Sequence, residues 1–219
     1  MKELGCEIQI KKKKARTLET VAATVIAVFF YLSLVLLVFT LSFTFCPVEG
    51  MSMFPTIHDG QNALLNKWDY RYERGEIIVF NKGDVKLIKR IIGVGGDKIE
   101  IKENEGVISV WRNDEMLVEE YIREDMLAWW TKPDFANRYG VNISLNTPVI
   151  IPDGEYCVFG DNRNNSLDSR VMFENPDKTI ALGFVKESEI EGSLAFLIPE
   201  NTFLEWVIRL IFGDLWRTN

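Results

Sequence analysis

One uncharged apolar segment constrains this 219-residue chain more than any other feature. No Asp, Glu, Lys or Arg occurs between Thr20 and Val48, and the part from Val25 to Phe45 is rich in Val, Leu and Phe. A hydrocarbon core of about 30 Å needs roughly 20 such residues in a helix. The segment is therefore long enough to span a membrane, which favours one anchor helix and one folded body.

The sequence at the end of this segment favours an anchor that is not cleaved. A signal peptide has an apolar region of only about 7–15 residues and ends in small side chains. Here the exit reads Phe43-Thr44-Phe45-Cys46, and Phe45 is bulky where cleavage or lipid attachment before Cys46 would need a small residue. The lysines at Lys11–Lys14 precede the span, so the positive-inside rule predicts a cytoplasmic N-terminus and an extracytoplasmic body after about residue 47.

The charge is unevenly distributed along the chain. The first 19 residues hold six basic and three acidic residues, whereas the whole chain holds 25 basic and 32 acidic residues and has a net charge of -7. The body is therefore acidic. Proteins that bind nucleic acid need clustered Lys and Arg on one face, so we expect no nucleic-acid partner.

Past the anchor, the pattern is that of short strands bounded by Gly, Asp, Asn and Pro, which predicts a mainly β fold. We expect strands at 77–80, 86–94, 98–101, 107–111, 149–151, 156–159 and 193–198. Asn113-Asp114 reads as a hairpin connection. The less regular stretch 121–148 is expected to pack its Trp129 and Trp130 into the body, with contact to lipid headgroups as the alternative.

These patterns divide the chain into four parts. We expect a basic cytoplasmic head at 1–19, an anchor at 20–48, a β-rich body at 49–199 with a hairpin and side-lobe insertion at about 98–148, and a C-terminal amphipathic segment at 200–219. Within the last part, 203–212 has helical spacing but keeps two charges, which suggests an interfacial or docking helix.

The cysteines and the single histidine suggest neither a disulfide framework nor a metal centre. Cys6, Cys46 and Cys157 lie in three different settings and are expected to be unpaired, although a Cys46–Cys157 bridge is conceivable. His58 lies six positions after Ser52, so a serine and histidine pair has to be considered. Its context, His58-Asp-Gly60, is nevertheless typical of a turn, and no cofactor or metal is expected.

A serine on a turn just after the anchor is the main catalytic candidate. Ser52 lies in the run Gly50–Thr56, GMSMFPT, and a serine hydroxyl becomes a useful nucleophile only when a base removes its proton. Lys89 could be that base if apolar neighbours such as Ile88 and Ile91 desolvate its amine. Lowering a lysine pKa from about 10.4 to about 8 costs roughly 3 kcal/mol. On the pattern alone, a solvent-exposed lysine on an edge strand is an equally simple interpretation.

Four motifs in order decide between these interpretations. They are SMFPT at 52–56, GEIIVF at 75–80, KRIIG at 89–93 with Gly96-Asp97, and GDNRNNSLDSR at 160–170. Together they resemble the motifs of bacterial type I signal peptidases, over about residues 20–198. The resemblance implies a membrane-bound serine endopeptidase that removes signal peptides from exported preproteins after small residues of the Ala-x-Ala type. Ser52 would be the nucleophile and Lys89 the general base, with His58 a bystander.

The resemblance also implies roles for residues around this pair. Ser166 would hydrogen-bond the lysine amine, Asp168 and Arg170 would form a supporting ion pair, and Gly160 would leave space beside the lysine. Gly50 stands where some relatives carry a hydroxyl that helps to stabilise the oxyanion, so the amide of Ser52 would do more of that work. The candidates for the substrate pockets are Met53, Ile77, Ile78, Val79 and Phe80.

The remaining implications concern partners and departures from the family pattern. The partners would be preprotein signal peptides and the lipid bilayer of the bacterial cell membrane, and contact with the export machinery is compatible with that placement. Gly95 stands where relatives usually have proline, and 171–182 looks like a local insertion. Two alternatives stay open: a catalytically silent relative, and one dedicated to a single substrate in pilus or surface-protein assembly. The apolar span argues against the soluble self-cleaving repressors.

Overall fold

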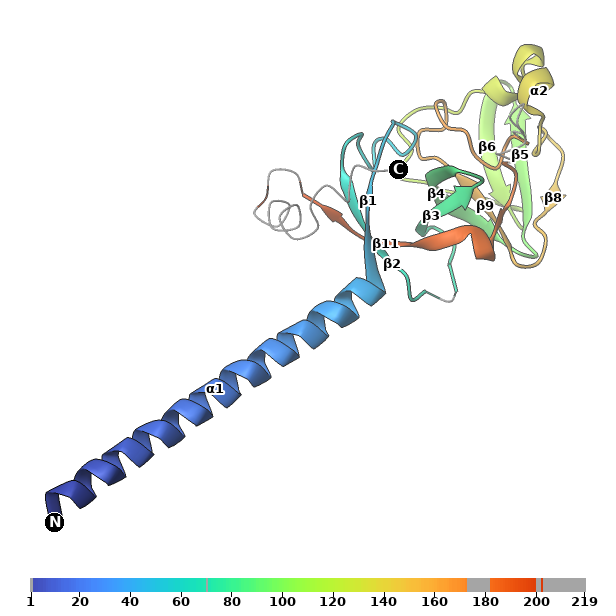
Figure 1. The fold of residues 1–219 in the computed structure, drawn as a ribbon. Coiled ribbons are helices and arrows are strands. Elements are labelled where there is room, and N and C mark those ends of the chain that lie inside the picture. The colour runs from blue at the N-terminus through green and yellow to red at the C-terminus, as the bar shows by residue number, and fades with distance from the viewer. Residues whose placement is uncertain (1, 70, 173–181, 200–201, 203–219) are drawn as a thin grey trace. The chain divides into compact units, whose positions relative to one another are not determined.

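The structure is a computed structural model that describes residues 2–69, 71–172, 182–199 and 202 (Figure 1). It divides into two compact units, Met1–Phe43 and Thr44–Asn219. The amphipathic segment predicted at 203–212 and most of the insertion predicted at 171–182 lie outside the described residues.

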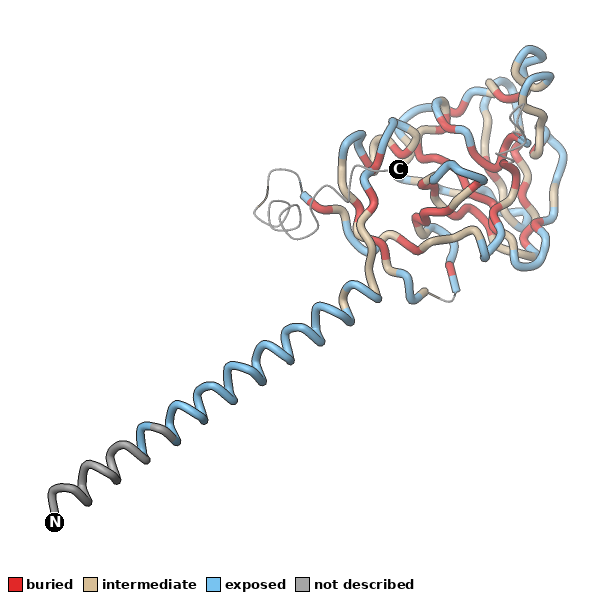
Figure 2. The backbone as a smooth tube through the Cα atoms, in the orientation of Figure 1, coloured by how far each residue is buried: buried red, intermediate tan, exposed pale blue. Residues whose placement is uncertain are grey.

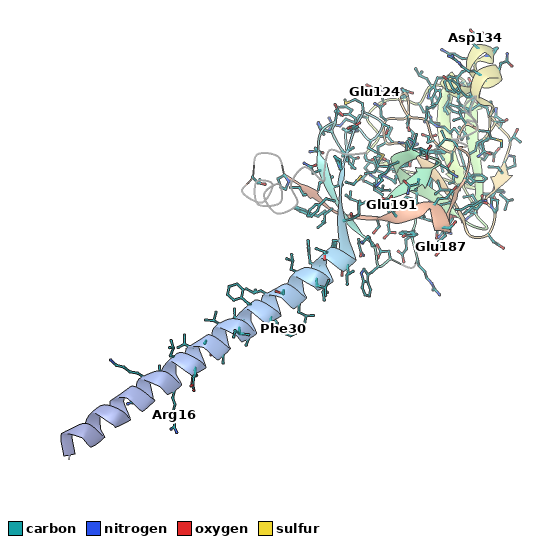
Figure 3. The ribbon with its side chains drawn as sticks, viewed as in Figure 1. Arg16, Phe30, Glu124, Asp134, Glu187 and Glu191 are labelled. Carbon is teal, nitrogen blue, oxygen red and sulfur yellow. The ribbon has the colours of Figure 1, made fainter. Side chains whose placement is uncertain are left out.

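The first unit is one long helix, α1 (Lys2–Ser42). Its segment Arg16–Ser42 is the one helix among the described residues that is long and apolar enough to cross a membrane. Most of this segment is exposed (Figure 2), and side chains such as Phe30 project outward from it (Figure 3). The hydroxyls of Thr20, Thr24 and Ser33 donate to carbonyls one turn earlier, so they need no water. The helix is consistent with a membrane anchor.

The second unit is built on two sheets, which confirms a mainly β body. The larger sheet has the strand order β1-β2-β11-β3-β4-β9-β10. Its strands are β1 (Phe43–Pro47), β2 (Asn62–Asn66), β3 (Ile77–Lys82), β4 (Val85–Val94), β9 (Glu155–Phe159), β10 (Val185–Lys186) and β11 (Ile190–Ile198). A short 3-10 helix, η2 (Glu187–Glu189), precedes β11.

The smaller sheet has the order β7-β6-β5-β8. Its strands are β5 (Lys98–Asn104), β6 (Val107–Arg112), β7 (Glu115–Met116) and β8 (Val149–Ile150). Asn113 and Asp114 connect β6 to β7 with φ angles of 52° and 69°, the positive values that tight hairpin turns require. The predicted hairpin is therefore confirmed.

Each of the seven predicted strand regions contains a strand, but the pattern missed or only implied four others. The uncharged segment does not stay helical to Val48, because its end forms the edge strand β1. A run of β-favouring residues ending at Pro47 suits a strand edge better than a helix. The short strands β2 and β10 were not predicted, and β7 was implied only as the second strand of the hairpin at Asn113-Asp114. β2 reads Asn-Ala-Leu-Leu-Asn, which has no β-branched residue.

The stretch 121–148 packs against the body through its aromatic residues, as predicted. It contains η1 (Trp129–Thr131) and α2 (Pro133–Tyr139). Trp130 is fully buried in a hydrophobic cluster with residues of β5 and β9, and its indole N–H donates to the Ile143 carbonyl at 2.9 Å. Cys46 and Cys157 are both buried and free, so the conceivable bridge between them does not form.

A buried carboxylate, Asp97, joins three segments at the corner between β4 and β5. It accepts two hydrogen bonds from the Arg74 guanidinium, at 2.7 and 2.8 Å. It also accepts one from the backbone N–H of Val94 at 3.0 Å and one from the side-chain amide of Asn113 at 2.8 Å. Burial alone would raise the pKa of Asp97, but these donors, Arg74 first, lower it to about 2. Asp97 is therefore a stabilising group while it is ionised.

Replacing Asp97 should make the protein less stable at neutral pH but less sensitive to acid. Because the folded-state pKa lies below the unfolded value, the carboxylate stabilises the fold above about pH 4 and loses that effect as the pH falls toward 2. Since Arg74 is half exposed, we expect Asp97→Asn to cost about 1–2 kcal/mol at pH 7. Urea unfolding at pH 7 and pH 3 checks this, and an equal loss at both values would contradict it.

Candidate active site

A closed loop between β1 and β2 carries Ser52. Backbone hydrogen bonds from Val48 to Gln61 (2.8 Å) and from Gly60 to Val48 (2.9 Å) join the two ends of the loop. Two side chains of the loop, Met53 and Ile57, are fully buried and anchor it in a hydrophobic cluster. Ser52 itself is partly exposed, so the loop presents a hydroxyl on a fixed support.

Lys89 lies on β4, which runs between β3 and β9 inside the larger sheet rather than at its edge. In the sheet register, it lies directly opposite Ile78 of β3. Only 2% of Lys89 is exposed. The interpretation of Lys89 as a solvated edge-strand lysine is therefore wrong.

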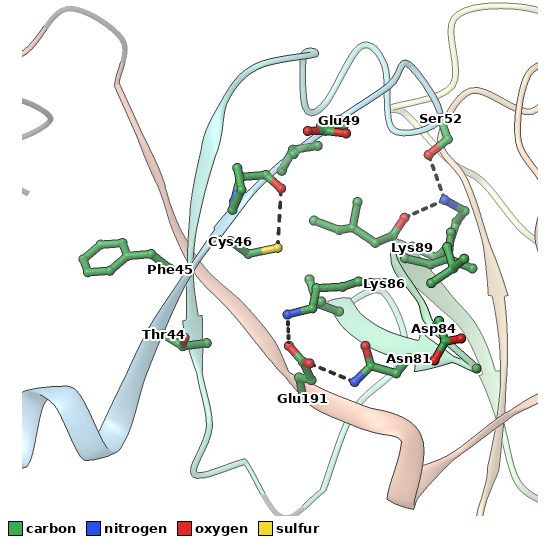
Figure 4. Close-up of a pocket in the computed structure, with 17 residues that line it drawn as sticks. Thr44, Phe45, Cys46, Glu49, Ser52, Asn81, Asp84, Lys86, Lys89 and Glu191 are labelled. Atoms are coloured by element: carbon green, nitrogen blue, oxygen red, sulfur yellow. Dashed lines mark hydrogen bonds and ion pairs between the residues drawn. The ribbon is translucent and has the colours of Figure 1, made fainter. Parts of the chain in front are cut away.

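The lysine amine and the serine hydroxyl are in direct contact (Figure 4). Lys89 Nζ and Ser52 Oγ lie 2.7 Å apart in a hydrogen bond, and Nζ also donates to the Ile88 carbonyl at 2.8 Å. Burial lowers the pKa of Lys89 to about 8, with Asp168 opposing and Arg170 assisting the shift. An amine with such a pKa can lose its proton near neutral pH and accept one from the serine.

The loop 160–170 makes hydrogen bonds to the loop that carries Ser52, which we call the serine loop. The Asn162 amide donates to the Ser52 carbonyl at 3.0 Å, and its side chain donates to the Met51 carbonyl at 3.1 Å. Arg90 makes two hydrogen bonds with the Asp161 carboxylate, at 2.8 and 2.6 Å, and the Thr56 hydroxyl donates to the same carboxylate at 2.5 Å. These contacts connect β4, the serine loop and the 160–170 loop.

Asp168 and Arg170 form the ion pair that the resemblance implied. Both side chains are fully buried, and two hydrogen bonds of 2.8 and 2.7 Å join them. Burial alone would raise the pKa of Asp168, but Arg170 and the Gly160 amide, which donates at 3.0 Å, keep it below its ordinary value. The pair therefore stays ionised in the interior.

Ser166 and Gly160 lie close together, but not in the predicted arrangement. Ser166 Oγ is buried and makes no hydrogen bond of normal geometry among the described residues, although it lies near enough to Asp168 to help lower that pKa. The predicted bond from Ser166 to the lysine amine is absent. A Cβ on Gly160 would collide with the Ser166 side chain and come within 2.5 Å of the Ser52 carbonyl, so the absence of a side chain at Gly160 makes room for Ser166 and Ser52.

A groove of about 790 Å³ runs from Ser52 and Lys89 along β1 and the start of β4 (Figure 4). Of the predicted pocket residues, only Val79 lines it. Met53 and Ile77 pack with Val79 in one buried cluster, whereas Ile78 and Phe80 belong to another, because alternate residues of a strand face opposite sides. The lining residues that sequence reasoning missed include Cys46, Val48, Lys86, Ile88 and Glu191.

His58 takes no part in the site. It is exposed, and its carbonyl accepts a turn hydrogen bond from the Gln61 amide. Within the described ranges, no group of three His, Cys, Asp or Glu side chains could hold a metal ion.

A serine hydroxyl bonded to a buried lysine amine, beside a groove that can accept an extended chain, is an arrangement suited to a serine peptidase. The family described as signal peptidase, peptidase S26, matches residues 19–198. This chain belongs to that family of serine peptidases, which cleave signal peptides from exported proteins. Membership also implies that the protein acts at a membrane, in agreement with the apolar helix.

Two relatives matched by sequence agree with this assignment. A signal peptidase I of Bacillus amyloliquefaciens is 34% identical over 198 residues, which cover 87% of this chain and 90% of the relative. Signal peptidase I S of Bacillus subtilis (strain 168) is 34% identical over 84% of this chain and 90% of its own length. A crystal structure of a signal peptidase I from Enterococcus faecalis V583 matches with a TM-score of 0.36 and 27% identity, covering 57% of this chain and 97% of that one.

Removing the buried amine should stabilise the protein. Because the folded-state pKa of Lys89 lies below its unfolded value, protonated Lys89 opposes folding below about pH 8, and this cost disappears as the pH rises toward 10.5. We expect Lys89→Met to raise the free energy of unfolding at pH 7 by roughly 1–3 kcal/mol, and by much less at pH 10. Denaturant unfolding at both values measures this.

The matched control is Lys86→Met, which removes a half-exposed lysine from the same strand. It should change stability by less than about 1 kcal/mol. A destabilised Lys89→Met protein at pH 7 would contradict the account of the buried amine.

Proposed function

We propose that this signal peptidase uses Ser52 as its nucleophile and Lys89 as its general base. The observation that supports this most directly is the 2.7 Å hydrogen bond between Ser52 Oγ and an amine that is almost fully buried. A neutral amine at that distance can take the serine proton without a histidine. The second support is the loop geometry, which holds Ser52 from both sides.

The reaction has two stages, and in each stage the same amine accepts one proton and then gives it up. Lys89 takes the proton of Ser52 as the serine oxygen attacks the carbonyl carbon of the scissile bond, and it then gives that proton to the departing amine of the mature protein. The resulting ester is cleaved by water, whose proton Lys89 accepts and returns to Ser52. The sequence predicts the Ser52 amide as a donor to the oxyanion; the Gly50 amide donates to Asp59 at 2.6 Å, and Gly50 has no hydroxyl to offer.

The substrate is proposed to be the export signal of a preprotein, lying extended in the groove with small residues one and three positions before the cut. The edge strand β1 leaves main-chain groups available for such a segment. Val48, Val79 and Ile88, which line the groove together with Ser52, are apolar and buried. A substrate side chain that lies against these apolar residues has little room, which favours alanine and rejects larger side chains by crowding.

The proposed setting is the bacterial cell membrane, crossed once by α1. Basic residues such as Lys13, Lys14 and Arg16 lie at the start of the apolar segment, which supports a cytoplasmic N-terminus and an extracytoplasmic catalytic body. The division into head 1–19, anchor 20–48, body 49–199 and C-terminal segment 200–219 stays a prediction. Preproteins emerging from the export machinery would then meet Ser52 outside the membrane.

Cleavage of a preprotein with an Ala-x-Ala site tests the proposed pair. With detergent-solubilised full-length protein, we expect Ser52→Ala and Lys89→Ala each to lose at least about 1,000-fold in kcat/KM, while Lys67→Ala, at an exposed lysine that does not line the groove, retains most of its activity. Cleavage by both site variants at the wild-type rate would contradict the assignment. A panel of unrelated preproteins distinguishes general processing from an enzyme dedicated to one substrate.

The pH dependence gives a separate prediction. Only neutral Lys89 can act as a base, so kcat/KM should rise with pH to a plateau with a midpoint near 8, the pKa to which burial lowers the amine. Initial rates between pH 6 and 10 measure this midpoint. A profile that is flat across this range would argue against a lysine base.

A further inference from the structure

The segment after β7 reaches back to the active site through two side chains, Glu119 and Tyr121. Sequence reasoning treated this region as part of a peripheral insertion. In the structure, each of the two side chains contacts an arginine that holds part of the catalytic apparatus. The two contacts lead to the serine loop by separate routes.

The first route runs through Arg163. Its guanidinium makes two hydrogen bonds with the Glu119 carboxylate, at 2.8 and 2.6 Å, and only 3% of the arginine side chain is exposed. Arg163 Nε also donates to the Gly160 carbonyl at 3.2 Å. Between Gly160 and Arg163 lies Asn162, whose amide holds the Ser52 carbonyl. Fixing the Arg163 side chain therefore fixes the peptide that supports the serine.

The second route runs through Arg90, the residue next to Lys89. The Tyr121 ring lies 4.0 Å from the Arg90 guanidinium, in cation–π geometry. Arg90 is also paired with Asp161, and Asp161 accepts the hydrogen bond from Thr56 on the serine loop. The Tyr121 ring therefore covers the Arg90–Asp161 ion pair. This pair links β4, the strand that carries Lys89, to the loop that carries Ser52.

The two routes meet at a hydrogen bond from the Tyr121 hydroxyl to the Glu119 carboxylate. Burial raises the pKa of Tyr121, and the adjacent carboxylate raises it further, so the phenol remains a donor. Neither Glu119 nor Tyr121 is among the residues that line the groove. They can therefore affect the relative positions of Ser52 and Lys89 without contacting the substrate.

We infer that Glu119 and Tyr121 are positioning residues that hold Ser52 against Lys89, so that the segment after β7 sets the catalytic rate. This inference rests on the proposed roles of Ser52 and Lys89. Loss of the Glu119 charge would leave the Arg163 cation buried without its carboxylate, and the Gly160–Arg163 peptide would shift. A misplacement of about 1 Å can cost up to roughly 100-fold in rate, whereas the groove would be unchanged.

Steady-state kinetics of the full-length protein in detergent tests the inference, with an Ala-x-Ala preprotein as substrate and kcat corrected for the folded fraction. We expect Glu119→Gln to lower kcat by roughly 10- to 100-fold with KM within about twofold. The neighbouring Glu120→Gln makes the same charge change at an exposed residue and should behave as the wild type.

Two further comparisons separate the routes. Tyr121→Phe keeps the ring over Arg90 and should lose less kcat than Tyr121→Leu, which removes it. If Glu119 acts through Arg163, the double variant Glu119→Gln/Arg163→Met should lose no more kcat than Arg163→Met alone. If Glu119→Gln does not fold, the comparison of Tyr121→Phe with Tyr121→Leu still tests the inference.

Wild-type kcat in the folded Glu119→Gln or Tyr121→Leu protein would overturn the inference for that residue. A lower melting temperature with unchanged kcat per folded molecule would do the same, because it would mean a purely structural role. Ser52→Ala is measured in parallel. If Ser52→Ala cleaves normally, the proposed function fails; if it is inactive while Glu119→Gln matches Glu120→Gln, only the present inference fails.

Discussion

The site depends on one unfavourable arrangement, the removal of the Lys89 amine from water. A lysine whose pKa falls from 10.5 to about 8 represents roughly 3 kcal/mol of lost solvation. The buried Asp168–Arg170 pair does not cancel this effect, because its two charges act on the amine in opposite directions. Burial therefore dominates, and the amine becomes a base strong enough to activate a serine yet weak enough to be neutral near physiological pH.

The rest of the body keeps that amine in place. β4 lies within the larger sheet, between β3 and β9, and Lys89 is almost fully buried there. The serine comes from a different element, a loop closed on itself and anchored by Met53 and Ile57. Hydrogen bonds from Asn162, and the contact of Thr56 with Asp161, bring the two together. Positioning of this kind is what the proposed roles of Ser52 and Lys89 require.

The sequence predicted the anchor, the seven strand regions and the candidate pair, because each is encoded by local pattern or by an ordered set of motifs. It did not predict which face of β3 borders the groove, since adjacent residues such as Ile78 and Val79 are equally apolar and only the register separates them. It placed Ser166 on the lysine, whereas Ser166 packs against Gly160. The contact of Glu119 with Arg163 joins residues 44 positions apart, which no local pattern reveals.

The central claim is that burial makes Lys89 a base near neutral pH, and a direct titration of this amine tests it. The full-length protein in detergent micelles, labelled with 13C at the lysine ε-carbon, can be followed by NMR from pH 6 to 11, with the Lys89 signal assigned from its loss in Lys89→Met. We expect this signal to titrate with a midpoint near 8, set apart from the other lysines. A midpoint at the ordinary value of about 10.4 would contradict the account.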